Sequence, residues 1–186
     1  WTMDKIGPIT RSVEDCALVL DAIHGHDGLD PTAVDQPFAW PSAVDLSRVK
    51  IGVPNLPDRS IDDRSEVALL RGLGFETVSV ELPTEYPASA VSMMIGTEAA
   101  AAFDVLTRGH VTEGLNEWPE TFRVGQLTPA VEYLRAARVR TLLMGEMAKL
   151  FEQVDAFLAW GGPDLTITNL TGHPSVIFPI GLTDRD

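Results

Sequence analysis

The order of apolar segments between residues 49 and 82 places the strongest constraint on the fold of this chain. A short β-branched run at 49–54 is followed by a segment at 62–73 whose apolar side chains recur with helical spacing. Leu73-Gly74-Phe75 then turns the chain into a second apolar run at 76–82, in which Val and Leu alternate with polar residues. Strand, helix and strand in this order predict two parallel strands joined by a crossover. We therefore expect an α/β fold with a mixed, partly parallel sheet flanked by helices.

The remaining segments extend this pattern. Helical spacing predicts helices at 12–24, 88–107 and 129–153, and apolar runs at 155–160 and 175–179 predict a third and a fourth strand. Two stretches rich in Gly and Pro, 25–48 and 108–128, are expected to be irregular. The chain has no internal repeat and no low-complexity tract, which favours a single domain over residues 1–186.

Charge and composition exclude several classes of partner. The net charge is −13, from 27 acidic against 14 basic residues, so the chain is expected to repel nucleic-acid phosphates and acidic membrane surfaces. No apolar run approaches the roughly 20 residues that span a bilayer. Cys16 is the only cysteine and lies in an apolar run, which predicts a small core residue and no internal disulfide. We expect a reducing, cytoplasmic compartment.

The residue types alone do not supply a complete catalytic set. His24, His26 and Asp27 match no dependable metal-binding spacing and are interpreted as a polar turn, so we expect no metal and no cofactor. No serine stands in a Gly-x-Ser-x-Gly context, and His173 is interpreted as a packed loop residue rather than a base. Arg140 and its helical neighbours are typical of a solvated face, although an arginine that reached a cleft could clamp a carboxylate.

Five stretches, taken together and in order, carry a family resemblance. They are residues 4–15, 20–31, 49–53, 133–155 and 169–181. The chain resembles the amidase-signature family, whose glutamine-hydrolysing members serve tRNA-dependent amidotransferases. The resemblance implies amide hydrolysis by a Lys-Ser-Ser triad through an acyl-enzyme. The matching region of the family follows the triad, so we expect no catalytic residue in this chain. Trp1 is not an initiator methionine, which also predicts one truncated domain that lacks the preceding signature region.

The same resemblance implies four substrate-binding residues. Arg140 is similar to the arginine that amidotransferase members use to hold a carboxylate, and Asp164 stands near the position of an acidic residue that holds an amino group. Asn169 and Thr171 belong to the closing motif, 169–175. The stretch between Trp160 and Asn169 is shorter than in the family, so the pocket shape is expected to differ.

Three functions remain open on the sequence. The first is an amidase that cleaves carbon-nitrogen bonds other than peptide bonds in small-molecule amides, to which this segment contributes scaffold and part of the substrate pocket. The second is the glutaminase subunit of a tRNA-dependent amidotransferase, and the third is a non-catalytic, family-derived binding module. The acidic loop at 25–48 and the short stretch before Asn169 favour the first. A sheet without its neighbouring strands would expose apolar faces, which predicts homo-oligomers or association with a partner.

Overall fold

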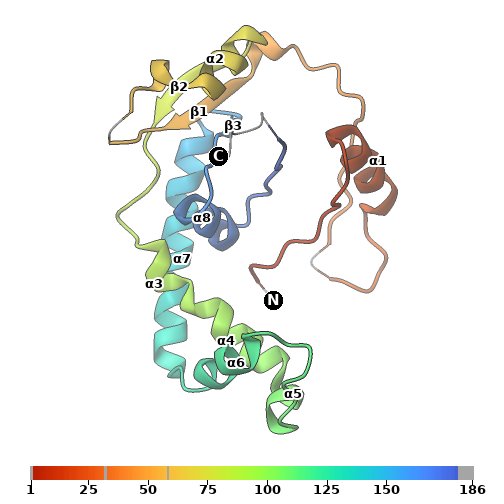
Figure 1. Cartoon of the computed structure of the whole chain (residues 1–186), viewed down its shortest axis with the longest axis vertical. Helices are drawn as coiled ribbons and strands as arrows, with labels where there is room; N and C mark the ends of the chain where they lie inside the picture. Colours follow the sequence, from red (N-terminus) through yellow and green to blue (C-terminus); the bar gives the residue numbers. More distant parts are fainter. Residues whose placement is uncertain (1, 32, 58, 180–186) are drawn as a thin grey trace, which may run out of the picture. The chain divides into compact units, whose positions relative to one another are not determined.

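The structure is a computed structural model that describes residues 2–31, 33–57 and 59–179. They fall into two compact units (Figure 1). The larger unit comprises the described residues of 1–4 and 46–175, and contains the sheet and most of the helices. The smaller unit comprises the described residues of 5–45 and 176–186.

The sheet of the larger unit is built around its central strand. Strand β1 (Lys50–Pro54) pairs in parallel with β2 (Glu76–Val80) on one side and with the short β3 (Ala156–Phe157) on the other. Helix α2 (Ser65–Gly72), preceded by the 3-10 turn η2 (Ile61–Asp63), makes the connection from β1 to β2. The predicted crossover and the α/β class are confirmed, and every strand pair in the described residues is parallel.

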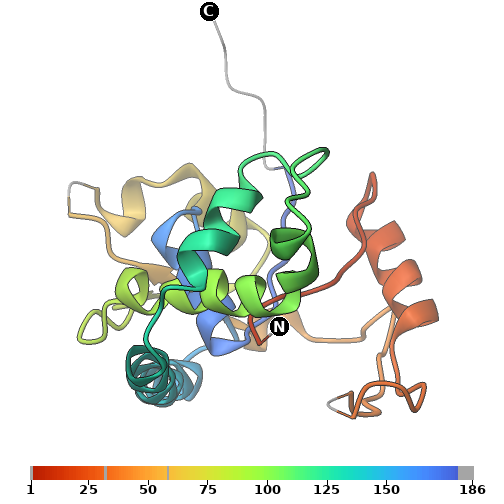
Figure 2. The same cartoon turned by 90° about the horizontal axis from the view of Figure 1, so that it is seen from below.

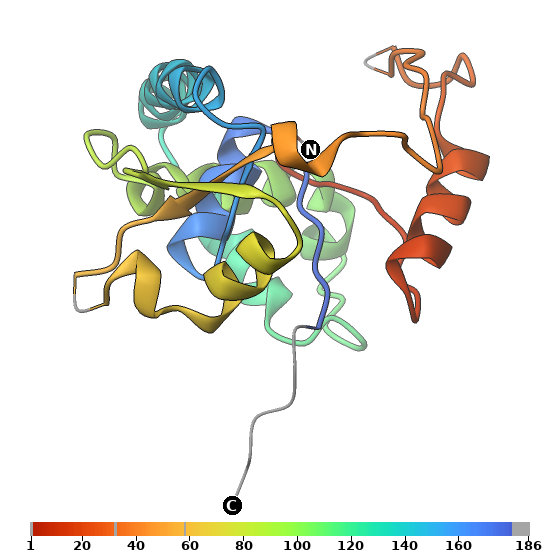
Figure 3. The ribbon, with the colours of Figure 1, turned by 90° about the horizontal axis from the view of Figure 1, so that it is seen from above.

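Helices cover both faces of this sheet. Val78 and Val80 pack with Met147 and Leu150 of α7 (Ala130–Phe151) and with Ile167 of α8 (Pro163–Thr171). Thr77, at a polar alternate position of β2, accepts a hydrogen bond from Arg71 of α2 on the other face. Figure 3 shows α2 and α7 on opposite sides of the sheet. The alternation in the sequence of this strand therefore distinguishes an apolar face from a wetter one.

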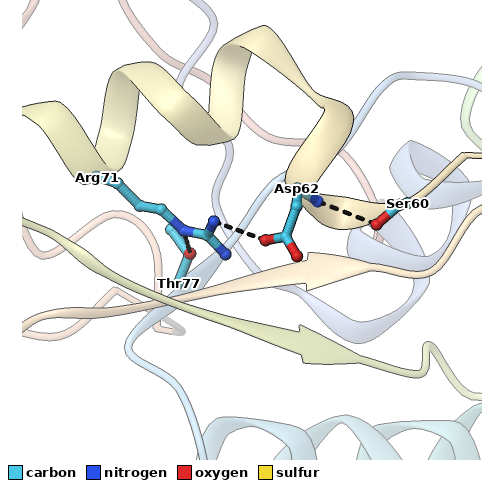
Figure 4. Close-up of polar contacts among 4 residues, drawn as sticks. All are labelled: Ser60, Asp62, Arg71 and Thr77. Carbon is cyan, nitrogen blue, oxygen red and sulfur yellow. Dashed lines mark hydrogen bonds and ion pairs between the residues drawn. The ribbon is translucent and has the colours of Figure 1, made fainter.

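Arg71 ties α2 to the wetter face of the sheet. Its Nε donates to the Thr77 hydroxyl of β2 at 2.7 Å, and its Nη1 donates to Asp62 Oδ1 of η2, also at 2.7 Å (Figure 4). The Ser60 hydroxyl accepts from the Asp62 backbone N–H and caps η2. These groups are solvent-exposed, so the contacts fix geometry more than they stabilise the fold.

The region between residues 88 and 128 differs from the prediction in two ways. The sequence predicts one long helix at 88–107, but the chain forms α3 (Ala88–Val91), α4 (Met93–Ala102) and α5 (Asp104–Arg108), separated at Ser92 and Phe103. The prediction that 108–128 is irregular is wrong for its second half, where α6 (Trp118–Gly125) forms with a proline in its first turn. A proline costs nothing at that position, because its missing N–H would be unpaired anyway.

Helices α4 and α6 approach each other very closely. Figure 2 shows them side by side, and a Cβ added to Gly125 would lie 2.2 Å from the Gly96 carbonyl oxygen and 2.9 Å from Ala100 Cβ. Only a glycine at residue 125 permits this backbone contact. At the opposite end of α7 from the sheet, the two helices form a separate layer (Figure 1).

The end of the described chain also corrects the prediction. The expected strand at 155–160 is reduced to two residues, and the expected fourth strand at 175–179 is not a strand, because it has no ladder partner in the described residues. Helix α8 forms where the sequence predicts no element. It starts after Gly161 and Gly162, both with positive φ, and ends at Gly172 with φ of 83°.

The smaller unit contains α1 (Val13–Ile23), close to the predicted 12–24. The Ser12 hydroxyl caps it by accepting from the Asp15 N–H at 3.0 Å. Cys16 is only half-buried, and its Sγ lies 3.0 Å from the Thr10 hydroxyl, so the prediction that it is a core residue is only partly met.

The α4–α6 contact gives a stability prediction. Gly125→Ala should lower the free energy of unfolding by about 1–3 kcal/mol, because the added methyl overlaps backbone atoms that cannot move away. Gly145→Ala is the matched control, because Gly145 lies in α7 with nothing within 4 Å of its added Cβ. It should be neutral or stabilising by up to about 1 kcal/mol. Urea unfolding measures both, and equal effects would contradict the close contact.

Candidate functional site

Arg140 lies in α7 and connects three separate parts of the larger unit. Its Nε donates to the carbonyl oxygen of Leu170 in α8, its Nη1 to the hydroxyl of Thr2, and its Nη2 to the Thr2 carbonyl oxygen at 2.8 Å. Three of the five guanidinium N–H groups are therefore used inside the described chain. The interpretation of Arg140 as a solvated surface residue is wrong, because it is half-buried and bound to backbone and side chain alike.

Glu98 of α4 is the acidic counterpart of this arginine. It is 9% exposed and accepts from the Thr2 N–H and hydroxyl, both at 2.8 Å, and from the Tyr133 hydroxyl at 2.9 Å. The Thr2 hydroxyl thus accepts from Arg140 and donates to Glu98, so it bridges the cation to the carboxylate. Burial raises the pKa of Glu98, but these hydrogen bonds outweigh it, and the pKa lies below its ordinary value of 4.5. Burial and the acceptor Glu98 together raise the pKa of Tyr133.

A hollow adjoins these polar groups. It has a volume of about 370 Å³ and is lined by Thr2, Glu98, Ala101, Ala102 and Tyr133. Its polar atoms come from a carboxylate and two hydroxyl groups, so they offer hydrogen bonds to a neutral or cationic ligand more readily than to an anion. Glu98 stands alone within an Ala-rich helical run, and no pattern in the sequence predicts a partner for it.

Helix α8 carries the other three predicted binding residues, but at different places. Asp164 lies in its first turn and accepts from the Trp160 N–H at 3.2 Å. Thr171 is buried at the other end, where its hydroxyl donates to the Ile167 carbonyl oxygen and lies 2.8 Å from His173 Nδ1. Asn169 is exposed. The Leu170 carbonyl brings Arg140 to the Asn169–Thr171 end, about 9 Å of helix away from Asp164.

A second arginine that the sequence did not single out lies at the carboxyl end of β1. Arg64 is 1% exposed, its Nη1 donates to the Pro54 carbonyl oxygen at 3.0 Å, and its Cζ lies 4.2 Å from the ring centre of Trp160. Its Nε and Nη2 have no acceptor in the part of the chain that the structure describes. Arg64 thus joins the ends of β1 and β3 next to the turn from which Asp164 starts α8.

Two further observations concern metal ligands and His173. Within 2–31, 33–57 and 59–179, no group of three His, Cys, Asp or Glu side chains could hold a metal ion. His173 stacks on Phe151 with ring centres 4.5 Å apart, as expected of a packed loop residue. Over the same ranges, no helix combines the length and the apolarity needed to cross a membrane.

Comparison with known proteins places this arrangement in a family. The family model described as Amidase matches residues 1–179, and the chain therefore belongs to the amidase family. This agrees with the resemblance drawn from the sequence motifs.

Individual relatives carry two kinds of name. The chain is 33% identical over 194 residues to a glutamyl-tRNA(Gln) amidotransferase subunit from Geobacter metallireducens, a match that covers 84% of this chain and 40% of the relative. It is 32% identical to an amidase of Pseudomonas putida, over 86% of this chain and 36% of that protein. The chain thus spans about two fifths of the curated relatives that it matches.

A solved structure matches with a TM-score of 0.57 and 27% identity, over 77% of this chain and 33% of that one. It is described as an inhibitor-bound, vestigial protein complex that reveals the evolutionary origins of an s-triazine catabolic enzyme. The two structures thus share the α/β fold, in agreement with the family assignment.

The Glu98 cluster gives a prediction that depends on pH. Tyr133→Phe removes one hydrogen bond to the carboxylate and should lower the free energy of unfolding by about 1 kcal/mol near neutral pH. The pKa of Glu98 in the folded state lies below its ordinary value of 4.5. The ionised carboxylate therefore stabilises the fold fully above pH 4.5, and this stabilisation is lost as the pH falls below 4.5 through the lower, folded-state pKa. The variant should therefore differ least from the parent in acid.

Urea unfolding at several pH values between acid and neutral measures the difference in stability between variant and parent. A carbon-detected NMR titration measures the pKa of Glu98. The control is Tyr86→Phe, because the described residues place Tyr86 in an apolar cluster and not among the hydrogen-bond partners of Glu98. The pKa of Glu98 should rise in Tyr133→Phe and stay unchanged in the control. A stability loss that is the same at every pH would contradict the assignment.

Proposed function

We propose that this chain is the scaffold and pocket-forming part of an amide hydrolase that acts on carbon-nitrogen bonds other than peptide bonds. The observation that carries the proposal is the Amidase family match over residues 1–179, together with the amidase relative at 32% identity. Hydrolysis proceeds through an acyl-enzyme on a Lys-Ser-Ser triad supplied from outside these 186 residues.

The role of this chain is to bind and orient the amide. Arg140 stands where α7, α8 and Thr2 meet, and two of its N–H groups remain for a ligand oxygen. Asn169 and Thr171 lie at the same end of α8. Asp164 serves a second, separate position at the start of that helix, where its carboxylate accepts from a backbone N–H. These four residues are the proposed substrate-binding set.

The alternative is a glutaminase subunit of a tRNA-dependent amidotransferase. Relatives at 33% and 34% identity that are named as amidotransferase subunits favour it. The charge of −13 argues against direct contact of this chain with tRNA, so a partner subunit would have to carry the nucleic acid.

The test is ammonia release. The gene product that contains this chain should release ammonia from small primary amides without tRNA or partner subunits, whereas the isolated 186-residue chain should release none. Release only from glutamine, and only with partner subunits, would establish the alternative. Hydrolysis by the isolated chain would refute the external triad, and a gene product inactive in every combination would leave a binding module.

The binding set gives a further prediction for the active gene product. Arg140→Lys keeps the charge but loses the planar fork, and should raise KM about tenfold or more with a smaller change in kcat. Arg135→Lys is the control, because Arg135 lies on the exposed side of α7 and pairs only with Glu132 among the contacts described. Equal effects of the two substitutions on KM would remove Arg140 from the binding set.

A further inference from the structure

We propose that the pocket between α4 and α6 binds the aryl or branched-alkyl part of a small, uncharged amide. The pocket has a volume of about 410 Å³, within the range of small-molecule sites. The inference rests on the proposed function for the choice of an amide, and it adds the class of substituent that the amide carries.

The packing of the two helices explains why a pocket forms there. Gly96 and Gly125 let the backbones touch at one end, and the contacts run in opposite directions along the two chains, so Phe103 meets Phe122 further along. At this end the small residues are replaced by rings. Phe103 stacks on Phe122 with centres 5.1 Å apart, and Trp118 lies 5.7 Å from Phe122. The glycine contact and the ring cluster therefore lie on the same pair of helices, and the pocket lies beside the rings.

The lining selects an apolar, uncharged occupant. Besides the three rings, the walls come from aliphatic side chains such as Ile95, Leu106 and Leu115. Phe103 and Trp118 are each 46% exposed, so ring surface is available to a ligand. Aromatic surface contributes strongly to binding when it is buried. Glutamine carries two charges, and of these the one charged residue of the described lining, Asp4, could pair only with the ammonium group. The carboxylate would lose its water without a partner there.

Charge further excludes acids. Asp4 is the one charged residue among the described residues of the lining, and the whole chain carries −13. A carboxylate ligand would be repelled on approach and within the pocket. A neutral carboxamide meets no such barrier.

The polar end of the ligand has a place beside the pocket. Ala102 lines both this pocket and the polar hollow, so the two adjoin. The Tyr133 hydroxyl donates a hydrogen bond to Glu98, and its oxygen keeps lone pairs that can accept from an amide N–H. A ligand with an apolar body and an amide head therefore fits across both.

The experiment measures binding to the 186-residue chain without turnover. Phenylacetamide is titrated by NMR, with acetamide and glutamine as comparison ligands. Phenylacetamide should bind at least tenfold more tightly than either. Ala102→Phe fills the pocket from an exposed position and should weaken phenylacetamide binding at least tenfold. Ala68→Phe, on an exposed position of α2, is the matched control and should leave the affinity unchanged.

Three results would overturn the proposal: no saturable binding of phenylacetamide, equal affinity for acetamide, or undiminished binding to Ala102→Phe. If the chain dimerises, and Ala102→Phe separates the copies while phenylacetamide fails to bind, the pocket is a contact between copies instead. The titration measures no turnover. An inactive gene product would therefore contradict the proposed function but not the binding of phenylacetamide to this pocket. A failed titration would contradict the pocket but not the proposed function.

Discussion

The structure of the larger unit depends on the central position of β1. Gly52 allows Val80 and Phe157 to pack over it, since a Cβ at this residue would lie 3.2 Å from side-chain carbons of both. The parallel pairing on each side then aligns the carboxyl ends of the strands, and Arg64 lies at that edge between Pro54 and Trp160. Helix α8, which carries three of the four proposed binding residues, follows β3 in the chain and starts near this edge of the sheet.

The buried polar groups divide into two kinds. Arg140 and Glu98 both bond to Thr2, so this residue links the half-buried cation to the buried carboxylate. Arg64 is different, because one edge of its guanidinium is bonded and its face lies over Trp160, while Nε and Nη2 find no acceptor in the described residues. The Nε and Nη2 atoms form the edge of a guanidinium that a carboxylate can bind with two parallel hydrogen bonds. The first group links separate elements, whereas Arg64 has buried guanidinium N–H groups with no acceptor in the described residues.

The sequence predicted the parts of the fold that depend on local pattern. The strand, helix and strand at 49–82 and the long helix at 129–153 follow from spacing alone, and the structure confirms them. The segment 175–179 resembles a strand because it is apolar, but a strand needs a partner and none is described for it. The start of α6 carried a usable signal in Trp118-Pro119. No local signal linked Glu98 to Thr2, because 96 residues separate them and tertiary packing alone brings them together.

The spacing of the strands in the chain also determines the order in which the sheet can form. Ile51 pairs with Thr77 across 26 residues and with Ala156 across 105. The loop closed by pairing β1 with β3 is about fourfold longer than the loop closed by pairing β1 with β2. Closing the longer loop costs about 1.2 kcal/mol more in chain entropy. We therefore expect β1 and β2 to pair first and β3 to dock onto them in a slower, non-local step of folding. We expect the ring of Trp160 to cover Arg64 only after β3 has docked, so water should leave this edge of the sheet late in folding.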